Sequence, residues 1–225
     1  MAGGRGVRLK PLTDTTPKPL LLVAGAPLIT YLITSLVKAN LKDITITTHY
    51  KPESFRDILG DGLTYGANFL YHEEPLPLGT AGCLPRLARQ FPNAHTFIVA
   101  NADILADIPW HGLLDHHHST NSDATFCTVT HNTQIEYGVV ASNGEVVEKP
   151  TISLPILAGI YVLNTQYLRD LAPNKVLQMP DLLNSMKEEK LLITSYQLPG
   201  MWLDVGRQSS LENAPATLQA ILEKP

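Results

Sequence analysis

The sequence predicts an α/β fold in which helices cover both faces of a mainly parallel, mixed sheet. Apolar residues occur at helical spacing in some segments and alternate as in strands in others, and the two kinds of segment follow one another along the chain. The 225 residues are 44% hydrophobic, with a mean hydropathy of +0.01, which suits one core of ordinary size. Strands that alternate with helices favour parallel pairing, with ligands at the carboxyl ends of the strands.

The elements follow in a regular order. Leu28, Leu32 and Leu36 recur at helical spacing after Pro27, which suits a first helical turn. Asn143-Gly144 favours a tight turn between two short β segments. The expected helices cover 28–37, 52–59, 80–91 with Thr80 as its cap, a histidine-rich segment after Trp110, 180–190, and 207–223 with an interruption at Pro215; the expected strands cover 43–47, 68–71, 95–100, 123–130, 156–163 and 191–196.

Cysteine content and charge exclude several classes of protein. Cys83 and Cys127 are too few for a disulfide scaffold or a four-cysteine metal site, and they fit a reducing cytosol. Histidines 116–118 are consecutive, so on a helix they cannot converge on one ion.

The net charge of −4 argues against a nucleic-acid partner. No apolar run approaches the roughly 20 residues of a membrane span, and no export leader is visible, so we expect a cytoplasmic protein.

The strongest motif is a glycine-rich loop at residues 3–13, followed by Pro17-Lys18-Pro19. Glycines let backbone N–H groups wrap a phosphate chain, and Arg8 and Lys18 place positive charges beside it. Residues 1–20 carry a net charge of +3, whereas the rest of the chain carries −7. An isolated G-G-x-G is more often a surface turn, but this combination indicates a local site for a phosphate anion.

This motif resembles the signature of the nucleotidyltransferases that make nucleotide sugars from a nucleoside triphosphate and a sugar 1-phosphate. Their G-G-x-G-[ST]-R-[LM]-x-P-L-T run precedes P-K-P, and this chain departs from it at Val7. Further matches cover nearly the whole chain in the family's order: L-G-T-A-G at 78–82, N-A-D at 101–103, Y-G-V-V at 137–140, E-K-P at 148–150 and W-L-D-V-G at 202–206. The resemblance implies a three-layer α/β/α, Rossmann-like nucleotidyltransferase fold and a magnesium-dependent, nucleotide-binding transferase of nucleotide-sugar biosynthesis.

The resemblance also implies roles for individual residues. Arg8 and Lys18 would be catalytic, and Asp103 and Asp204 would bind Mg²⁺, which accepts few protein ligands beside phosphate oxygens and waters. The implied nucleotide-binding residues are Ala2, Gly3, Gly4, Gly6, Glu74, Gly79 and Thr80, and the implied sugar-phosphate-binding residues are Gly138, Glu148, Lys149 and Leu157.

In the reaction that the resemblance implies, a phosphate oxygen of the sugar 1-phosphate attacks the α-phosphorus of the triphosphate and expels pyrophosphate. The nucleophile is already an anion, so no general base is required. L-G-T-A-G and residues 179–183 look most like bacterial, GDP-sugar-forming, mannose-1-phosphate guanylyltransferase-like domains, with uridylyl and thymidylyl branches as alternatives. The partners would be the two substrates, with a homo-oligomer as a further possibility.

A second hypothesis is a nucleotide-sugar-binding or regulatory domain without turnover. Its basis is the set of departures from the family pattern at Val7, Ala102 and Leu157. The family also begins with a short apolar strand before the glycine-rich loop, and many members continue into a β-helix or another module. By this resemblance we expect residues 1–225 to form a single catalytic domain without that first strand or a C-terminal module, and with a gap or exposed edge in the sheet.

Overall fold

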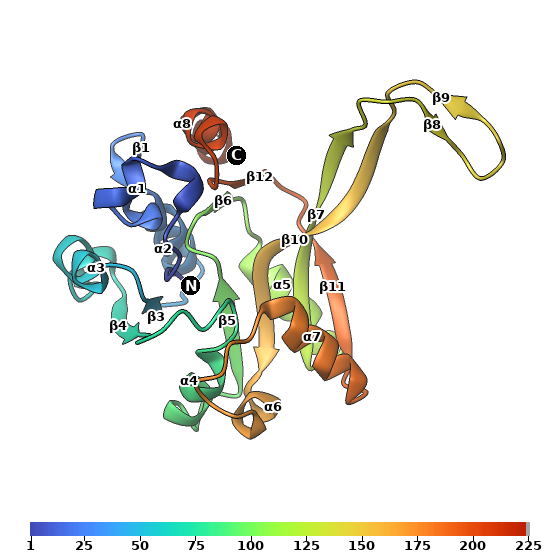
Figure 1. Ribbon diagram of the computed structural model, residues 1–225. Coiled ribbons are helices and arrows are strands. Elements are labelled where there is room, and N and C mark those ends of the chain that lie inside the picture. Colours follow the sequence, from blue (N-terminus) through green and yellow to red (C-terminus); the bar gives the residue numbers. More distant parts are fainter. Residues whose placement is uncertain (224–225) are drawn as a thin grey trace.

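A mixed sheet with helices on both faces organises the computed structural model, which describes residues 1–223 (Figure 1). Its largest part has the strand order β11-β7-β10-β5. β10 is antiparallel to both neighbours and β11 is parallel to β7, so β5, β7 and β11 share one direction. β3 and β4 form a separate parallel pair. The bounds are β3 Asp43–Thr48, β4 Asn68–Glu73, β5 Thr96–Ala100, β7 Ala124–Gln134, β10 Thr151–Asn164 and β11 Ile193–Gln197.

Two cores lie on opposite faces of β10. Tyr161 and Leu163 belong to the core that includes α4 (Leu84–Gln90), α6 (Thr165–Asp170) and α7 (Met179–Glu188). Ile160 and Val162 belong to the core that includes α2 (Leu28–Lys38) and α5 (Trp110–Ser119). Because successive side chains of a strand point to opposite faces, these cores confirm the predicted three layers.

Most of the predicted elements are present, with two corrections. α3 spans Pro52–Leu59 as predicted, but α4 begins at Leu84 and not at Thr80. The Thr80 hydroxyl instead accepts a hydrogen bond from the Met179 N–H, at 2.7 Å, at the start of α7. α8 (Gln208–Leu222) continues through Pro215 without the predicted interruption.

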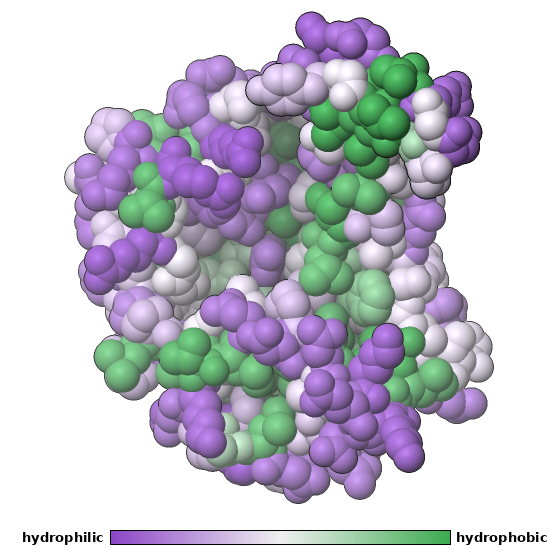
Figure 2. Space-filling model, turned by 45° about the vertical axis from the view of Figure 1, so that its right-hand side comes forward, coloured by the Kyte–Doolittle hydropathy of each residue, from purple (hydrophilic) through white to green (hydrophobic). Residues whose placement is uncertain are grey.

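A hairpin arm formed by the outer halves of β7 and β10 projects from the body of the molecule (Figure 1). β8 (Val139–Val140) and β9 (Val146–Val147) lie at its end and flank the predicted Asn143-Gly144 turn, where Gly144 has a φ of 86°. Figure 2 shows the surface hollowed between this arm and the rest of the chain. The arm exposes Tyr137, Val140, Val146, Val147, Ile152 and Leu154.

Shorter elements complete the chain around the glycine-rich loop. Short 3-10 helices at Val7–Leu9 and Lys18–Leu20 flank α1 (Leu12–Thr15), and β1 (Leu22–Val23) pairs with β2 (Ala26–Pro27). A third 3-10 helix covers Leu63–Tyr65. β6 (Ile104–Ala106) pairs antiparallel with β12 (Trp202–Asp204). Within residues 1–223, no helix has the length and apolar character needed to cross a membrane.

Candidate active site

Lys18, Asp103 and Asp204 meet in one cluster. The Lys18 ammonium nitrogen contacts Oδ2 of Asp103 and lies 3.8 Å from Oδ1 of Asp204. Asp103 immediately precedes β6, and Asp204 ends β12. The β6–β12 pair sets Asp204 opposite Ile104, and the Val205 N–H donates to the Asp103 carbonyl at 3.0 Å. Antiparallel pairing therefore brings the two carboxylates together although they are far apart in the sequence.

The backbone around Lys18 is held by two prolines. Pro17 precedes the 3-10 helix Lys18–Leu20, and Pro19 lies in its first turn. The Leu20 N–H donates to the Pro17 carbonyl at 2.8 Å, and both Pro19 and Leu20 are buried. The Lys18 side chain itself is only 12% exposed. Its charge is thus fixed in place, because fixed φ angles and buried neighbours limit the movement of this turn.

Burial and charge act in opposite directions on Asp204. Burial raises its pKa most, and the neighbouring Asp103 carboxylate raises the pKa further, whereas Lys18, Arg8 and Arg207 lower it. A Cβ at Gly206 would lie 3.0 Å from Oδ1 of Asp204 and 3.1 Å from Nη2 of Arg8. Both side chains therefore approach Gly206, and the Arg8 guanidinium lies close to the Asp204 carboxylate. The site therefore gathers cations around two close carboxylates.

The sequence analysis missed Arg207. This residue precedes α8 and lowers the pKa of Asp204. Its position three residues after Asp204 was the available signal, but the matched motif ends at Gly206.

Hydrogen bonds from two side-chain hydroxyls to backbone carbonyls hold the glycine-rich loop in place. Gly6 has a φ of 62°, and a Cβ there would lie 2.9 Å from Cγ2 of Thr13 and 3.1 Å from Cβ of Lys18. The Thr13 hydroxyl donates to the Gly6 carbonyl at 2.9 Å, and the Tyr50 hydroxyl donates to the Thr13 carbonyl at 3.0 Å. Glycine is required here because an L-residue would be strained and would also overlap with its neighbours.

The loop begins beside Asp103. The Ala2 N–H donates to the Thr47 carbonyl at the end of β3, at 2.8 Å, and the Ala102 N–H donates to the Met1 carbonyl at 3.0 Å. Ala102, which stands at a position where the family has glycine, is buried in the same cluster as Ala2. Gly3 packs near His49, where a Cβ would lie 3.4 Å from that of the histidine, and Gly4 has open space around it. The predicted phosphate loop and the predicted metal ligands are therefore neighbours.

The segment predicted to read the base packs against the residues before α7. Gly79 has a φ of 81°, and a Cβ there would meet the Leu177 carbonyl at 2.6 Å. The Thr80 N–H donates to Oε1 of Gln178 at 3.3 Å, a partner that the sequence analysis missed because it lies on a separate segment. Glu74 accepts a hydrogen bond from the Leu78 N–H at 3.4 Å. These contacts give the segment a defined shape.

The predicted sugar-phosphate residues lie on the arm and at its base. A Cβ at Gly138 would lie 3.2 Å from a Glu148 carboxylate oxygen, so these two residues are adjacent. Lys149 is exposed and has a φ of 44°. Leu157 packs against the core that includes α4 and α7. Across the described part of the chain, no ion pair joins Lys149 to the Lys18 cluster.

Asp103 and Asp204 are the residues that could hold a divalent cation. Among residues 1–223, no group of three or more His, Cys, Asp or Glu side chains could hold a metal by itself. Mg²⁺ commonly takes one or two carboxylates, with waters and substrate phosphates completing its octahedron. Two adjacent carboxylates beside the predicted phosphate loop fit this requirement. A cation there would offset the repulsion from Asp103 that, after burial, raises the pKa of Asp204.

Comparisons with known proteins identify relatives of this chain by sequence. A family model described as nucleotidyl transferase matches residues 1–220. A mannose-1-phosphate guanyltransferase of Yarrowia lipolytica is 35% identical over 222 residues. The mannose-1-phosphate guanylyltransferase catalytic subunit beta of Dictyostelium discoideum is 33% identical over 217 residues. Each alignment covers 92% of this chain, which spans 60% of the length of each relative.

Solved structures share the fold. A putative glucose-1-phosphate thymidylyltransferase from Bacillus anthracis, in complex with a sucrose, superposes with a TM-score of 0.80 at 24% identity, over 97% of this chain and 93% of that one. HddC from Yersinia pseudotuberculosis, complexed with GMP-PN, superposes with a TM-score of 0.76 at 21% identity, over 96% of each chain. At these identities the superpositions establish the Rossmann-like architecture, while substrates have to be argued from the site.

Proposed function

The chain belongs to the nucleotidyl transferase family, and from this premise we propose that it transfers a nucleoside monophosphate from a nucleoside triphosphate to a sugar 1-phosphate. The observation that carries the proposal is the position of the Lys18 ammonium nitrogen. It contacts Asp103, lies 3.8 Å from Oδ1 of Asp204 and is next to the glycine-rich loop. The glycine-rich loop, the turn that carries Lys18 and the two segments that carry Asp103 and Asp204 thus bring cations, carboxylates and backbone N–H donors together. This set of groups suits a triphosphate, whose negative charge must be neutralised as a bond to phosphorus breaks.

In the proposed reaction, a phosphate oxygen of the sugar 1-phosphate forms a bond to the α-phosphorus. The bond between the α-phosphorus and the oxygen that bridges it to the β-phosphorus breaks, and pyrophosphate leaves with the electron pair. No proton has to be removed from the nucleophile, so the chain needs positioning and charge neutralisation. Lys18 and Arg8 neutralise charge on the transferred and leaving phosphates. The loop residues Gly3, Gly4 and Gly6 hold the triphosphate through their backbone N–H groups, whereas the Ala2 N–H is already bonded to the Thr47 carbonyl.

We also propose Mg²⁺ as the cofactor, held by Asp103 and Asp204. When bound, the ion would neutralise phosphate charge and orient the triphosphate. Lys18 contacts the same carboxylates, so it can hold the two aspartates in position and also face the substrate.

The two substrates would occupy the two sides of the hollow in Figure 2. On the body, Glu74, Gly79 and Thr80 lie in the segment that would read the base. On the arm, Glu148 beside Gly138 would accept hydrogen bonds from sugar hydroxyls, and the exposed Lys149 would pair with the sugar phosphate. We propose guanine as the base and mannose as the sugar, because the curated relatives at 33–35% identity are named as mannose-1-phosphate guanyltransferases.

Pyrophosphate release tests this proposal. The chain is incubated with Mg²⁺ and each of GTP, UTP, dTTP, CTP and ATP, in every combination with mannose 1-phosphate and glucose 1-phosphate. We expect release that depends on both substrates and is fastest with GTP and mannose 1-phosphate. Calorimetric binding of nucleotide with no release in any combination would instead support the nucleotide-sugar-binding or regulatory domain.

A further inference from the structure

His49 directly follows β3 and lies where the predicted phosphate loop meets the segment predicted to read the base. A Cβ at Gly3 would lie 3.4 Å from the Cβ of His49, so the start of the loop is one neighbour of this residue. On the other side of the same segment, the Glu74 N–H donates to the Thr48 carbonyl at 2.8 Å. His49 therefore lies between Gly3 and Glu74, at the carboxyl end of a parallel strand, which is where sheets of this kind bind ligands.

The side chains of His49 and Glu74 belong to the same face of the β3–β4 pair. The parallel register pairs Thr48 with Glu73, so the residues that follow them, His49 and Glu74, are level with each other. Successive side chains of a strand point to opposite faces, and residues that are level on neighbouring strands point to the same one. The imidazole and the Glu74 carboxylate are therefore side by side.

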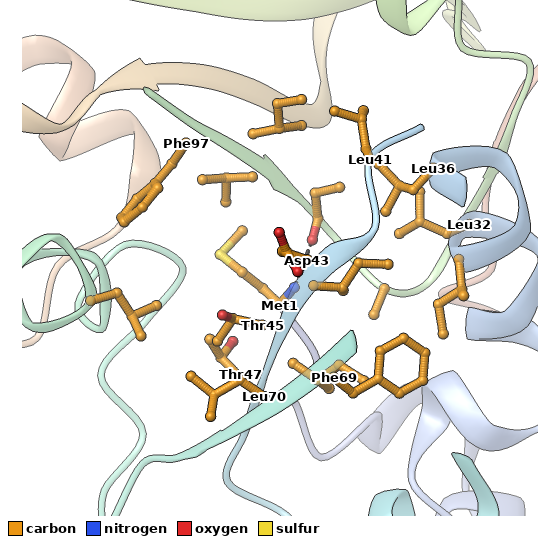
Figure 3. Close-up of a pocket in the computed structure, with 18 of the residues that line it drawn as sticks. Met1, Leu32, Leu36, Leu41, Asp43, Thr45, Thr47, Phe69, Leu70 and Phe97 are labelled. Carbon is orange, nitrogen blue, oxygen red and sulfur yellow. Dashed lines mark hydrogen bonds between the residues drawn. The ribbon is translucent and has the colours of Figure 1, made fainter. Parts of the chain in front are cut away.

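This face is the one that carries the segment predicted to read the base. Figure 3 shows the side chains of Thr45 and Thr47 on the same side of β3. The side chains of Thr47 and Glu74 both interact with the thiol of Cys83, which precedes α4. Because side chains alternate along the chain, His49 projects to the side of Thr47 and hence of Cys83.

One ring nitrogen of His49 is held by the backbone, and the other is open. Nδ1 lies 2.9 Å from the Glu74 carbonyl oxygen. A carbonyl oxygen can only accept a hydrogen bond, so Nδ1 carries the proton and Nε2 of the neutral ring is an acceptor. Residues 1–223 supply no hydrogen-bond partner for Nε2, and the atom is not buried, so it is accessible to a ligand.

The Glu74 carboxylate is partly engaged within the chain. Its Oε2 accepts a hydrogen bond from the Leu78 N–H at 3.4 Å, and the carboxylate also interacts with the Cys83 thiol. A base edge that presents two adjacent donors is therefore better matched by Glu74 together with a second acceptor. Nε2 of His49 is an acceptor on the same face.

We propose that His49 is a specificity-determining residue of the nucleotide site and that its Nε2 accepts a hydrogen bond from the exocyclic amine of guanine. Glu74 accepts from the ring N–H beside that amine. Among the common bases only guanine places a ring N–H next to an exocyclic amine, so two neighbouring acceptors select it. A site built to accept a hydrogen bond discriminates strongly against an analogue that lacks the donor. This inference rests on the proposed function, because it takes a guanine nucleotide as the ligand.

Calorimetric titration of nucleotides with Mg²⁺, in the absence of a sugar phosphate, tests the proposal. His49→Asn removes Nε2, while the asparagine amide nitrogen takes the place of Nδ1 as the donor to the Glu74 carbonyl. His111→Asn, an exposed change on α5, is the matched control. The ligands are GTP, 2′-deoxyGTP and inosine triphosphate, which is GTP without the exocyclic amine.

We expect the wild type to bind GTP roughly 5–50-fold more tightly than inosine triphosphate, because the acceptors lose a partner when the amine is absent. His49→Asn should lose a similar factor toward GTP and 2′-deoxyGTP and should bind inosine triphosphate as the wild type does. His111→Asn should keep the wild-type affinity for all three nucleotides.

Three results would overturn the proposal. Equal affinities of the wild type for GTP and inosine triphosphate contradict it without any variant. Equal weakening of GTP and inosine triphosphate in His49→Asn would make His49 a support for Glu74 only. A loss in His49→Asn that is seen with GTP but not with 2′-deoxyGTP would assign Nε2 to the ribose 2′-hydroxyl.

The proposed transfer reaction can fail separately, because the titrations measure binding alone. A chain that shows the expected His49 effect but releases no pyrophosphate supports this inference and contradicts the transfer. A chain that releases pyrophosphate, but whose preference for GTP over inosine triphosphate is unchanged by His49→Asn, contradicts this inference alone. A wild type that binds none of the three nucleotides contradicts both.

Discussion

The ammonium nitrogen of Lys18 contacts the Asp103 carboxylate, and the β6–β12 pair places Asp204 at the same nitrogen, 3.8 Å away. One cation from the N-terminal loop region thus joins two acidic residues from distant parts of the chain. This arrangement is the basis of the proposed roles of Lys18 toward a triphosphate and of the two carboxylates toward a metal ion.

Lys18→Ala should reduce turnover by about 10²–10³-fold, because it removes a preorganised positive charge beside the reacting phosphate. Pyrophosphate release with GTP and a sugar 1-phosphate measures this effect. Lys10→Ala is the matched control, since the Lys10–Asp14 pair has side chains 57% and 51% exposed, and such surface pairs contribute about 0–1 kcal/mol. Equal turnover in the two variants would contradict the assigned role of Lys18.

Asp204→Asn should separate activity from stability. The substitution keeps the shape of the side chain but removes one of two neighbouring carboxylates that repel each other. We expect the melting temperature without metal to stay the same or rise, while turnover falls at least about 100-fold. Asp57→Asn, an exposed change on α3, is the control for the loss of one charge. A large loss of stability without metal would show that Asp204 is structural.

Gly6→Ala should destabilise the fold by about 1–3 kcal/mol, because an L-residue at a φ of 62° is strained and its Cβ would lie 2.9 Å from Cγ2 of Thr13. Gly4→Ala is the control, since Gly4 has no positive φ and nothing lies within 4 Å of a Cβ there. Denaturant unfolding of the two variants measures the difference. Equal stabilities would mean that the loop adopts another shape in solution.

His117→Gln should change the pH dependence of stability. His117 is buried, with Nδ1 2.9 Å from the Thr125 hydroxyl and Nε2 3.2 Å from Oδ1 of Asn164. Burial lowers the His117 pKa, while the hydrogen bond to Asn164 raises it by less. At a pH below about 6.5, the ordinary pKa of histidine, the folded state therefore binds fewer protons at His117 than the unfolded state.

The contribution of neutral His117 to the free energy of unfolding is accordingly present above about pH 6.5. It is lost as the pH falls toward the lowered pKa of His117 in the folded state. Between pH 7.5 and 5, the melting temperature of the wild type should fall more than that of His117→Gln. His118→Gln, an exposed change on the same helix, should follow the wild type. A wild-type curve parallel to that of His117→Gln would contradict this account.

The sequence predicted those elements whose signals are local. α3 was predicted with its observed bounds because Pro52 and Gly60 mark its ends, and β3 was predicted because Ile44 and Ile46 alternate with polar residues. β6 and β12 have three residues each, too few to show a period, so their pairing could not be predicted.

The candidate site was predicted through motifs, and its geometry required the structure. No local pattern states that Lys18 reaches Asp103, because that contact depends on the packing of separate segments. Thr80 was predicted as the cap of α4, yet its hydroxyl bonds to Met179, a residue on another segment of the chain. Residues with a side-chain oxygen can satisfy any nearby N–H, so long-range packing decides which one they bind.

The most direct test of the central claim follows the labelled phosphorus atoms of GTP. With mannose 1-phosphate and Mg²⁺, a label at the α-phosphorus should appear in a sugar nucleotide, and a label at the γ-phosphorus should appear in pyrophosphate. Lys18→Ala should lose both transfers together. An α-label that stays in GTP, or that is released as GMP whether or not the sugar phosphate is present, would contradict nucleotidyl transfer to a sugar 1-phosphate.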